Sequence, residues 1–405
     1  MKVVILNTSG CNGGAAVVSL RLMRALRENG IDARMLVVDR GSGDEFVDIA
    51  GTPEQRKWAF YRERFKIWTC NGFSRSELFK VSIANMGVDV LSHDWIKSAD
   101  IVCLNWINQG MMSLRDIGRL CRMGKKVVWT MHDMWCCTGI CHHSYGCMEY
   151  EEECGNCKFL HSHRSGDLSH RVWLKKKRLF DKGGIHFVAV SNWLAGCCRN
   201  SSLLAGKPLS VIPNALPIEK FDYHRLPSDG TTVVAMGAAR LDDPVKGFDL
   251  MIEAANYIAD NHKEDAKRIK LLLFGNLRDE SLLGRIRVAY EWIGPVKPDE
   301  IPGIYKRSDV VLSSSHFETL PTTLVEGQAA GCLAVAFDHG GQSDIVEHCK
   351  TGYLAAYPDT EDLAAGIVWA SRHAADRQAL HAIAASRFST QAIASAYCHL
   401  FENLK

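Results

Sequence analysis

The sequence predicts an α/β protein of two Rossmann-like domains, each built on a parallel sheet. Apolar runs of strand length alternate with helical patterns along the chain, which is typical of parallel sheets covered by helices. The 405 residues also exceed what one hydrophobic core usually serves, so two domains are expected. We expect the two sheets to be joined near residues 212–216.

The expected strands follow from the apolar runs. In the first half these runs cover residues 3–6, 35–38, 101–104, 127–129 and 187–190, and in the second half residues 233–236, 271–274, 310–312 and 333–336. We therefore expect an N-terminal domain of residues 1–211 and a C-terminal domain of residues 212–387. No internal repeat or low-complexity segment interrupts them.

Composition favours a cytoplasmic protein. The chain is 47% hydrophobic and 23% charged, as in ordinary globular proteins. No apolar run reaches the roughly 18 residues of a membrane span. The first residues read as a strand followed by glycines and not as a signal peptide, and fifteen cysteines without a secretion signal indicate a reducing compartment.

The net charge of +2 hides an asymmetry. Residues 1–210 carry 29 Lys and Arg against 20 Asp and Glu, and the rest carry 19 against 26. Segments 55–68 and 170–180 of the basic half interleave cations with aromatic residues. Such segments suit peripheral association with an anionic membrane, on its inner face, although the aromatic residues could instead face the core. A pI near 7.9 does not favour nucleic acid as a partner.

The segment 316–331 suits a ligand with both phosphate and hydroxyl groups. Glu318 falls in the loop after a buried strand, and Pro321 and Gly331 suit the first turn and the end of a helix that contains Glu326. The free amides of Thr322 and Thr323 would point at an anion there. A sugar nucleotide is such a ligand, although two solvated charges are the simpler interpretation of two Glu residues.

Two cations occupy another strand-to-helix loop. Arg240 and Lys246 lie between the strand-like run at 233–236 and an amphipathic helix that begins near Phe248. Arginine can bind two phosphate oxygens at once and lysine acts as a point charge, so this loop suits a diphosphate leaving group.

These motifs together resemble the retaining glycosyltransferases of family 4, over nearly the whole chain. The resemblance rests on Arg240, Lys246-Gly247, Phe274-Gly275-Asn276, Glu318 with Glu326, His339-Gly340-Gly341, and the linker-like segment Ile212-Pro213-Asn214-Ala215. Residues 129–157 also resemble a bacterial polysaccharide-assembly branch of that family. The resemblance implies the GT-B architecture, in which the two sheets face a central cleft and the last helix, here within residues 388–405, packs back on the first domain.

The resemblance also implies roles for individual residues. It gives catalytic roles to Glu318, Arg240, Lys246 and His132, and donor-binding roles to Glu326, Thr319, Leu320, Thr322, Thr323, Gly275, Gly13 and Gly14. His132 ends a strand of the first domain, where it would lie beside the donor sugar, and its neighbour Asp133 is a weaker candidate. The cations replace a catalytic metal, so no cofactor is expected for catalysis.

A nicotinamide oxidoreductase is the main rival for the N-terminal loop. Gly10, Gly13 and Gly14 follow the first expected strand, and Asp39 ends the second, where a ribose-binding acid would lie. A G-x-G-x-x-G motif starting at Gly10 would need glycine at Asn12 and Ala15, and has neither. The loop instead resembles the glycosyltransferase loop that lets phosphates or acceptor approach the backbone, while a merely tight turn stays open.

Four cysteines form a candidate structural zinc site: Cys141, Cys147, Cys154 and Cys157. A closing C-x-x-C with two further thiolates suits a tetrahedral site. The spacing is not a standard double C-x-x-C, so disulfides or unbound thiols remain alternatives.

The expected function is transfer of a sugar from a UDP-, GDP- or ADP-sugar to a saccharide or lipid-linked saccharide acceptor, in cell-surface polysaccharide assembly. Two other functions remain open. One is another GT-B sugar-nucleotide enzyme, an epimerase or a phosphorylase. The other is a non-catalytic sugar-nucleotide-binding subunit.

Overall fold

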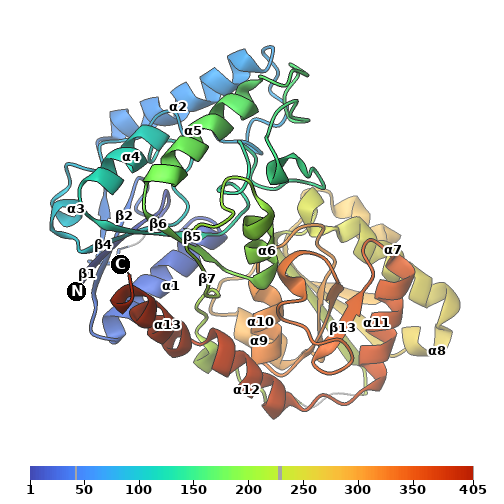
Figure 1. Ribbon diagram of the computed structural model, residues 1–405. Helices are drawn as coiled ribbons and strands as arrows, with labels where there is room; N and C mark the ends of the chain where they lie inside the picture. The colour runs from blue at the N-terminus through green and yellow to red at the C-terminus, as the bar shows by residue number, and fades with distance from the viewer. Residues whose placement is uncertain (42, 227–229, 405) are drawn as a thin grey trace. The chain divides into compact units, whose positions relative to one another are not determined.

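The chain divides into two compact units in a computed structural model that describes residues 1–41, 43–226 and 230–404. The first unit comprises Met1–Ala215 together with Ile393–Lys405, and the second comprises Leu216–Ala392. Figure 1 shows both units along the colour-coded chain.

The first unit is built on a seven-stranded parallel sheet of order β3-β2-β1-β4-β5-β6-β7. Its strands are β1 (Lys2–Leu6), β2 (Asp32–Val37), β3 (Val47–Ile49), β4 (Ile101–Leu104), β5 (Lys126–Met131), β6 (Ile185–Ala189) and β7 (Leu209–Val211). Its helices are α1 (Gly14–Glu28), α2 (Pro53–Cys70), α3 (Asp94–Ser98), α4 (Leu114–Arg122), α5 (Leu168–Lys182), α6 (Asn192–Asn200) and α13 (Thr390–Glu402), with a 3₁₀ turn η1 (Glu149–Glu151).

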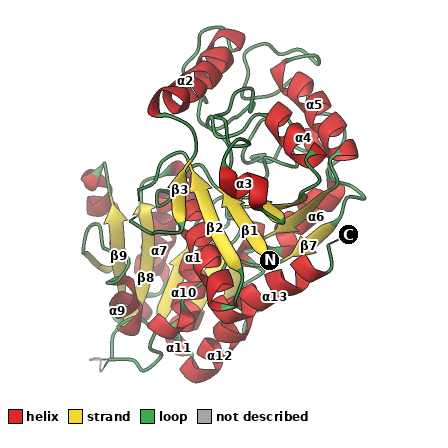
Figure 2. Cartoon of the chain, turned by 90° about the vertical axis from the view of Figure 1, so that its left-hand side faces the viewer, coloured by secondary structure: helices red, strands yellow, loops and turns green. Residues whose placement is uncertain are grey.

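Helices α1 and α13 cover one face of this sheet, and α2, α4 and α5 lie on the other side (Figures 1 and 2). Leu22 and Leu26 of α1 share one core cluster with Ile393 and Tyr397 of α13. The Tyr397 hydroxyl also forms a buried 2.8 Å hydrogen bond with the hydroxyl of Thr130 in β5. The last helix is therefore an integral part of the first unit.

The second unit is built on a six-stranded parallel sheet of order β10-β9-β8-β11-β12-β13. Its strands are β8 (Thr232–Arg240), β9 (Ile269–Asn276), β10 (Ala289–Trp292), β11 (Val310–Ser313), β12 (Leu333–Phe337) and β13 (Gly352–Ala355). Its helices are α7 (Phe248–Asn261), α8 (Lys263–Ala266), α9 (Ile301–Lys306), α10 (Thr322–Ala329), α11 (Thr360–Arg372) and α12 (Arg377–Phe388), with 3₁₀ turns η2 (Ile218–Lys220), η3 (Pro244–Lys246), η4 (Glu280–Arg285) and η5 (Gly340–Gln342).

The predicted fold class is confirmed, since both units are Rossmann-like with wholly parallel sheets. Each of the nine apolar runs overlaps a strand. In both sheets the strand order reverses once, between β1 and β4 and between β8 and β11. Such a reversal leaves a crevice at the carboxyl ends of the strands, where ligands bind in open α/β sheets. No helix in the described part of the chain is long and apolar enough to cross a membrane.

Candidate functional site

The predicted site residues of the second unit gather where its strand order reverses. Arg240 is the last residue of β8, Lys246 ends the turn η3 that follows, and Glu318 lies in the loop after β11. Because β8 and β11 are hydrogen-bonded neighbours, their two loops meet at one edge of the sheet.

Lys246 and Glu318 form an ion pair at this edge. The Nζ atom of Lys246 donates to Oε1 of Glu318 at 2.6 Å. Both side chains are largely removed from solvent, with 33% and 18% of their area exposed. The attraction of Glu318 outweighs burial and raises the pKa of Lys246, so the ammonium stays charged. The structure thus brings two predicted catalytic residues into direct contact.

The backbone fixes the position of Lys246. Gly247 has a φ of +60°, and a Cβ there would lie 2.0 Å from the carbonyl oxygen of Ser314. The hydroxyl of Ser314 donates to the carbonyl of Lys246 at 3.2 Å, and the amide of His316 donates to the carbonyl of Val245 at 2.8 Å. Only glycine permits this approach, which explains the Lys-Gly pair in the motif.

Arg240 has different partners from those of Lys246. Its guanidinium lies 3.0 Å from a carboxylate oxygen of Asp243 and 3.5 Å from one of Asp242. Among the described residues no ion pair joins Arg240 to Glu318. These two aspartates were not singled out from the sequence, and a diphosphate at this loop would compete with them for Arg240.

Helix α10 supplies the remaining donor-side candidates. It begins at Thr322, and Pro321 is its N-cap, so Pro321 lies one residue outside the first turn in which the sequence predicted it. The amides of Thr322 and Thr323 therefore stand in the first turn, where no intrahelical acceptor is available. Glu326 lies one turn further on and is buried. Burial raises the pKa of the neighbouring Tyr305 hydroxyl well above its usual range, and the charge of Glu326 adds to this effect.

A pair of glycines holds the loop that precedes α10. The amide of Gly341 donates to the carbonyl of Glu318 at 2.7 Å. A Cβ at Gly341 would lie 1.9 Å from the carbonyl oxygen of Thr319, and one at Gly340, where φ is +72°, would lie 2.6 Å from that of Glu318. Leu320, which follows Thr319 in this loop, is buried. The backbone of this loop is therefore fixed by direct backbone contact.

Gly275 has a structural reason to be glycine. It lies near the end of β9 with a φ of +121°, and a Cβ there would lie 1.8 Å from the carbonyl oxygen of Ala238. Its amide donates to the carbonyl of Gly294 at 2.7 Å. The donor-binding role predicted for Gly275 stays a prediction.

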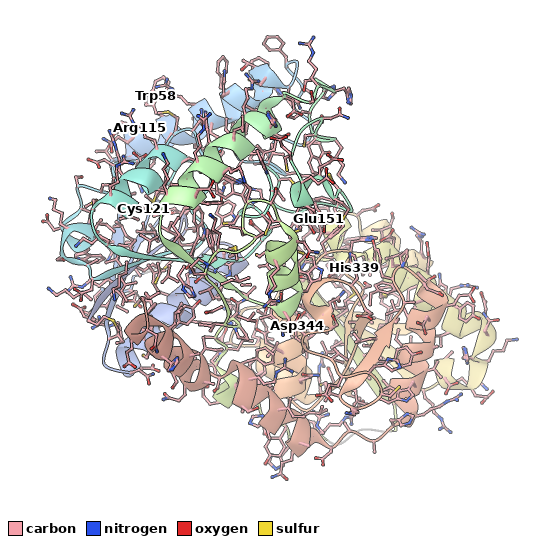
Figure 3. All side chains as sticks on the ribbon, viewed as in Figure 1. Trp58, Arg115, Cys121, Glu151, His339 and Asp344 are labelled. Carbon is pink, nitrogen blue, oxygen red and sulfur yellow. The ribbon has the colours of Figure 1, made fainter. Side chains whose placement is uncertain are left out.

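Three aromatic side chains near Glu318 were not predicted as a group. His316 Nδ1 lies 2.8 Å from the hydroxyl of Tyr357, whose ring stacks on that of His339 with centroids 4.3 Å apart. His339 is labelled in Figure 3. Tyr357 follows β13, so its place after a strand could have marked it, but β13 was not recognised in the sequence.

In the first unit His132 and Asp133 directly follow β5. Burial lowers the pKa of His132 to about 4, so its imidazole is neutral at neutral pH. Burial opposes a charge on Asp133, but His142 and His143, together with the amide of Trp135, outweigh it and lower the pKa of this carboxyl to about 2. Asp133 accepts from Trp106 Nε1 at 3.0 Å and lies 2.7 Å from His142 Nδ1. Asp133 therefore organises a cluster beside His132 that sequence reasoning only partly found.

The glycine loop of the first unit has open space beside Gly13 and Gly14. Gly13 has a φ of +91° and caps α1, which begins at Gly14. No atom lies within 4 Å of a Cβ built at either residue. The loop thus leaves room for a ligand to approach its backbone, and the donor-binding roles of Gly13 and Gly14 stay predictions.

The four cysteines line one small cavity. Its volume is about 30 Å³, and Thr138, Tyr150 and Phe159 are among its other lining residues. The amide of Gly139 donates to Sγ of Cys154 at 3.1 Å. No three His, Cys, Asp or Glu side chains in the described residues are arranged to hold a metal ion. The thiols share a cavity without forming a metal centre in their present rotamers, and zinc stays a prediction.

A buried lysine adjoins this cavity. Lys176 of α5 is 0% exposed, and its ammonium donates to the carbonyl oxygen of Thr138 at 3.0 Å. Its nitrogen lies 3.3 Å from the ring centroid of Trp135. Burial lowers the pKa of Lys176 to about 8. No carboxylate forms an ion pair with Lys176 in the part of the chain described.

Comparison with solved structures identifies the fold. A glycosyltransferase from Rickettsia africae has a TM-score of 0.65 at 15% identity, covering 100% of this chain and 98% of that one. Anabaena Alr3699/HepE in complex with UDP and glucose has a TM-score of 0.63 at 17% identity over 100% of both chains. The fold is thus the two-domain GT-B fold of glycosyltransferases.

Sequence comparison identifies the family to which the second unit is related. Residues 219–387 match the family described as "Glycosyl transferases group 1". The gpi3 subunit of phosphatidylinositol N-acetylglucosaminyltransferase from Schizosaccharomyces pombe is 27% identical over 191 residues, 44% of this chain and 39% of that protein. The putative colanic acid biosynthesis glycosyl transferase WcaC of Escherichia coli is 25% identical over 214 residues, 48% of this chain and 50% of that protein. The chain spans half or less of the length of these relatives, and its second unit is related to the group 1 glycosyltransferases.

Proposed function

We propose that this protein is a retaining glycosyltransferase that moves a sugar from a nucleotide-diphosphate donor to a saccharide or lipid-linked saccharide acceptor. The observation that carries the proposal is the Lys246–Glu318 ion pair at the reversal point of the second sheet, beside the first turn of α10. The match of residues 219–387 to group 1 glycosyltransferases supports it, because this segment contains every donor-side candidate of the second unit.

Binding of the donor diphosphate would change the ion pairs that Lys246 and Arg240 form in the structure. Breaking the bond between the anomeric carbon and the phosphate oxygen leaves negative charge on the β-phosphate. Lys246 would exchange Glu318 for this phosphate, and Arg240 would exchange its aspartates, which is electrostatic stabilisation by charges already in place. The first-turn amides of α10 would add to this stabilisation. Glu318, released from Lys246, is then able to accept from the hydroxyls of the transferred sugar.

The acceptor completes the reaction. Its hydroxyl oxygen bonds to the anomeric carbon on the face that the phosphate leaves, and its proton passes to a phosphate oxygen, so no protein base is required. His132 is neutral, and it can hydrogen-bond a sugar hydroxyl without adding charge. Glu326 would hold the ribose hydroxyls. Two protein cations serve the diphosphate, so we propose a metal-independent reaction.

Substrate and setting are proposed from the relatives. The solved complex of HepE with UDP and glucose supports testing a UDP-sugar before GDP- and ADP-sugars. The similarity to WcaC supports a role in bacterial cell-surface polysaccharide assembly. Nucleotide-sugar chemistry of this kind fits the cytoplasm, with the enzyme at the inner face of the membrane where a lipid-linked acceptor would be presented.

We also propose that Cys141, Cys147, Cys154 and Cys157 bind one structural zinc ion. Their cavity of about 30 Å³ has room for one ion. A tetrathiolate zinc centre carries net negative charge, which would stabilise the buried ammonium of Lys176. Binding requires the thiols to turn toward the cavity.

The test combines donor binding with product analysis. A saturating donor should raise the melting temperature by mass action, and the matching UDP-, GDP- or ADP-sugar should raise it most. The purified protein should then hydrolyse that donor slowly in water. NMR of the transferred or hydrolysed sugar should show the donor's anomeric configuration. An inverted anomer would refute retention, a new sugar nucleotide would indicate an epimerase, and binding without turnover would indicate a non-catalytic subunit.

A further inference from the structure

Helix α2 has one buried face that fixes its orientation on the first unit. Its start is well defined, since the hydroxyl of Thr52 accepts from the amide of Gln55 while the Gln55 side chain accepts from the amide of Thr52. Ala59, Glu63 and Ile67, spaced four residues apart, are each at most 2% exposed. The face opposite this stripe must therefore point away from the unit.

That outward face is aromatic. Trp58, Tyr61 and Phe65, spaced three and four residues apart, are 68%, 55% and 61% exposed. Trp58 is labelled in Figure 3, on the helix drawn in blue. Phe73 and Phe79, in the segment after the helix, are each 64% exposed. These residues are five of the eleven exposed large hydrophobic side chains of the described residues, which concentrates the exposed aromatic surface in one short segment.

The aromatic surface is held in place beyond the helix end. Trp68 Nε1 donates to the carbonyl oxygen of Phe73 at 2.6 Å, and the two rings meet edge to face with centroids 4.9 Å apart. Phe65 and Trp68 are in ring contact at 5.7 Å. Phe73 has a φ of +61°, a conformation that an aromatic residue adopts only when its surroundings impose it. A contiguous series of rings thus runs from the helix into the following turn.

The exposed charges that α2 itself contributes are nearly all positive. Lys57, Arg62 and Lys66 of α2 are exposed. Glu63, by contrast, points inward, where Oε1 accepts from the hydroxyl of Ser82 at 2.6 Å, and its carboxylate pairs with buried Arg64 at 3.0 Å. Because Glu63 is buried, Glu54 in the first turn is the only exposed acid that α2 contributes.

We propose that α2 docks the protein on an anionic lipid bilayer, with Trp58, Tyr61 and Phe65 in the headgroup region and Lys57 with its neighbouring cations on the lipid phosphates. Exposed aromatic rings flanked by basic side chains are the pattern of helices that lie in the membrane interface. The sequence left open whether the aromatic residues of its two basic segments face the core. This alternative is wrong for Trp58, Tyr61 and Phe65 of α2, whereas Trp173 and Phe180 of α5 are buried. The docking rests on α2 alone, and its use in reaching a lipid-linked acceptor rests on the proposed function.

Co-sedimentation of the full chain with vesicles tests the docking. We expect binding to vesicles of phosphatidylglycerol and phosphatidylcholine, little binding to phosphatidylcholine alone, and weaker binding as salt rises. Each cation near an anionic surface contributes about 1 kcal/mol, so the triple variant Lys57→Ala, Arg62→Ala, Lys66→Ala should bind about a hundredfold more weakly. The double variant Trp58→Ala, Phe65→Ala should also lose binding to anionic vesicles.

Two matched controls lie on the second unit. Tyr290→Ala removes an exposed aromatic ring, and Lys267→Ala removes an exposed lysine, and both variants should bind vesicles like the wild type. Equal binding to neutral and anionic vesicles, or none to either, would overturn the proposal. So would a dimer that dissociates in the Trp58→Ala, Phe65→Ala variant without any vesicle binding, because a second copy would then cover the face. Donor hydrolysis in solution, measured alongside, separates failure of docking from failure of the proposed function.

Discussion

Replacing Lys246 with alanine removes the cation that we place against the leaving phosphate. In the structure it also leaves the carboxylate of Glu318, 18% exposed, without its 2.6 Å partner. The change therefore acts on turnover through the lost phosphate contact and on stability through the unpaired acid. The two effects differ in size, which allows them to be separated.

The expected magnitudes follow from burial and distance. An exposed ion pair contributes about 0–1 kcal/mol and breaking a fully buried one costs about 3–5 kcal/mol. With a third of the Lys246 side chain exposed, we expect a loss of about 1–2 kcal/mol. At about 2–4 °C per kcal/mol for a domain of this size, the melting temperature should fall by only a few degrees. Loss of a preorganised charge partner should cut kcat about 10²-fold or more, or about 2.7 kcal/mol of barrier.

The assay measures kcat, KM and melting temperature for Lys246→Ala beside a matched lysine. Lys306 also pairs with an acid at 2.6 Å, here Asp222, and 34% of its side chain is exposed. It ends α9, away from the carboxyl ends of the strands. Lys306→Ala should lower the melting temperature slightly and leave kcat unchanged. Wild-type turnover in Lys246→Ala combined with Arg240→Ala, or equal losses of kcat in Lys306→Ala and Lys246→Ala, would refute the assignment.

Three further predictions concern the other parts of both units. Glu326→Ala should mainly raise the donor Kd, whereas Glu318→Ala should lower kcat more than affinity, as calorimetry and initial rates would reveal; the reverse pattern would exchange their roles. Gly341→Ala puts a Cβ 1.9 Å from the Thr319 carbonyl oxygen, so donor binding should weaken at least tenfold with the fold retained by circular dichroism; unchanged binding would contradict a fixed loop. Freshly purified reduced protein should carry about one zinc, and Cys154→Ser should lose it and destabilise the first unit. Metal analysis without zinc would dismiss that site.

The strands that the sequence did not reveal are the edges of both sheets. β3 and β7 border the first sheet, and β10 and β13 border the second. None has a continuous buried run, and all three residues of β7 are only partly buried. Central strands in parallel sheets are covered on both faces, so they read as apolar runs, whereas an edge strand lacks that constraint. Periodicity therefore finds the middle of such a sheet and misses its borders.

The candidate site shows the same division between local and spatial information. Gly247 and the helix start after Pro321 could be read from neighbouring residues, because turns and helix starts depend on local geometry. Lys246 and Glu318 are 72 positions apart in the sequence. That they lie in one site was predicted from the family resemblance and not from local spacing. Neither local spacing nor the resemblance indicated the aspartates around Arg240 or the ring of Tyr357. Their roles depend on side-chain directions that spacing does not encode.

The contribution of α13 to the first unit has a consequence for protein synthesis. Residues 216–392 are translated between the two parts of that unit. Translation proceeds at roughly 5–20 residues per second, so Ile393 and Tyr397 leave the ribosome on the order of ten seconds or more after the rest of the first unit. Until then Leu22 and Leu26 of α1 lack part of their apolar cover. The second unit, contiguous in sequence, can fold first, and the unit that is translated first is completed last.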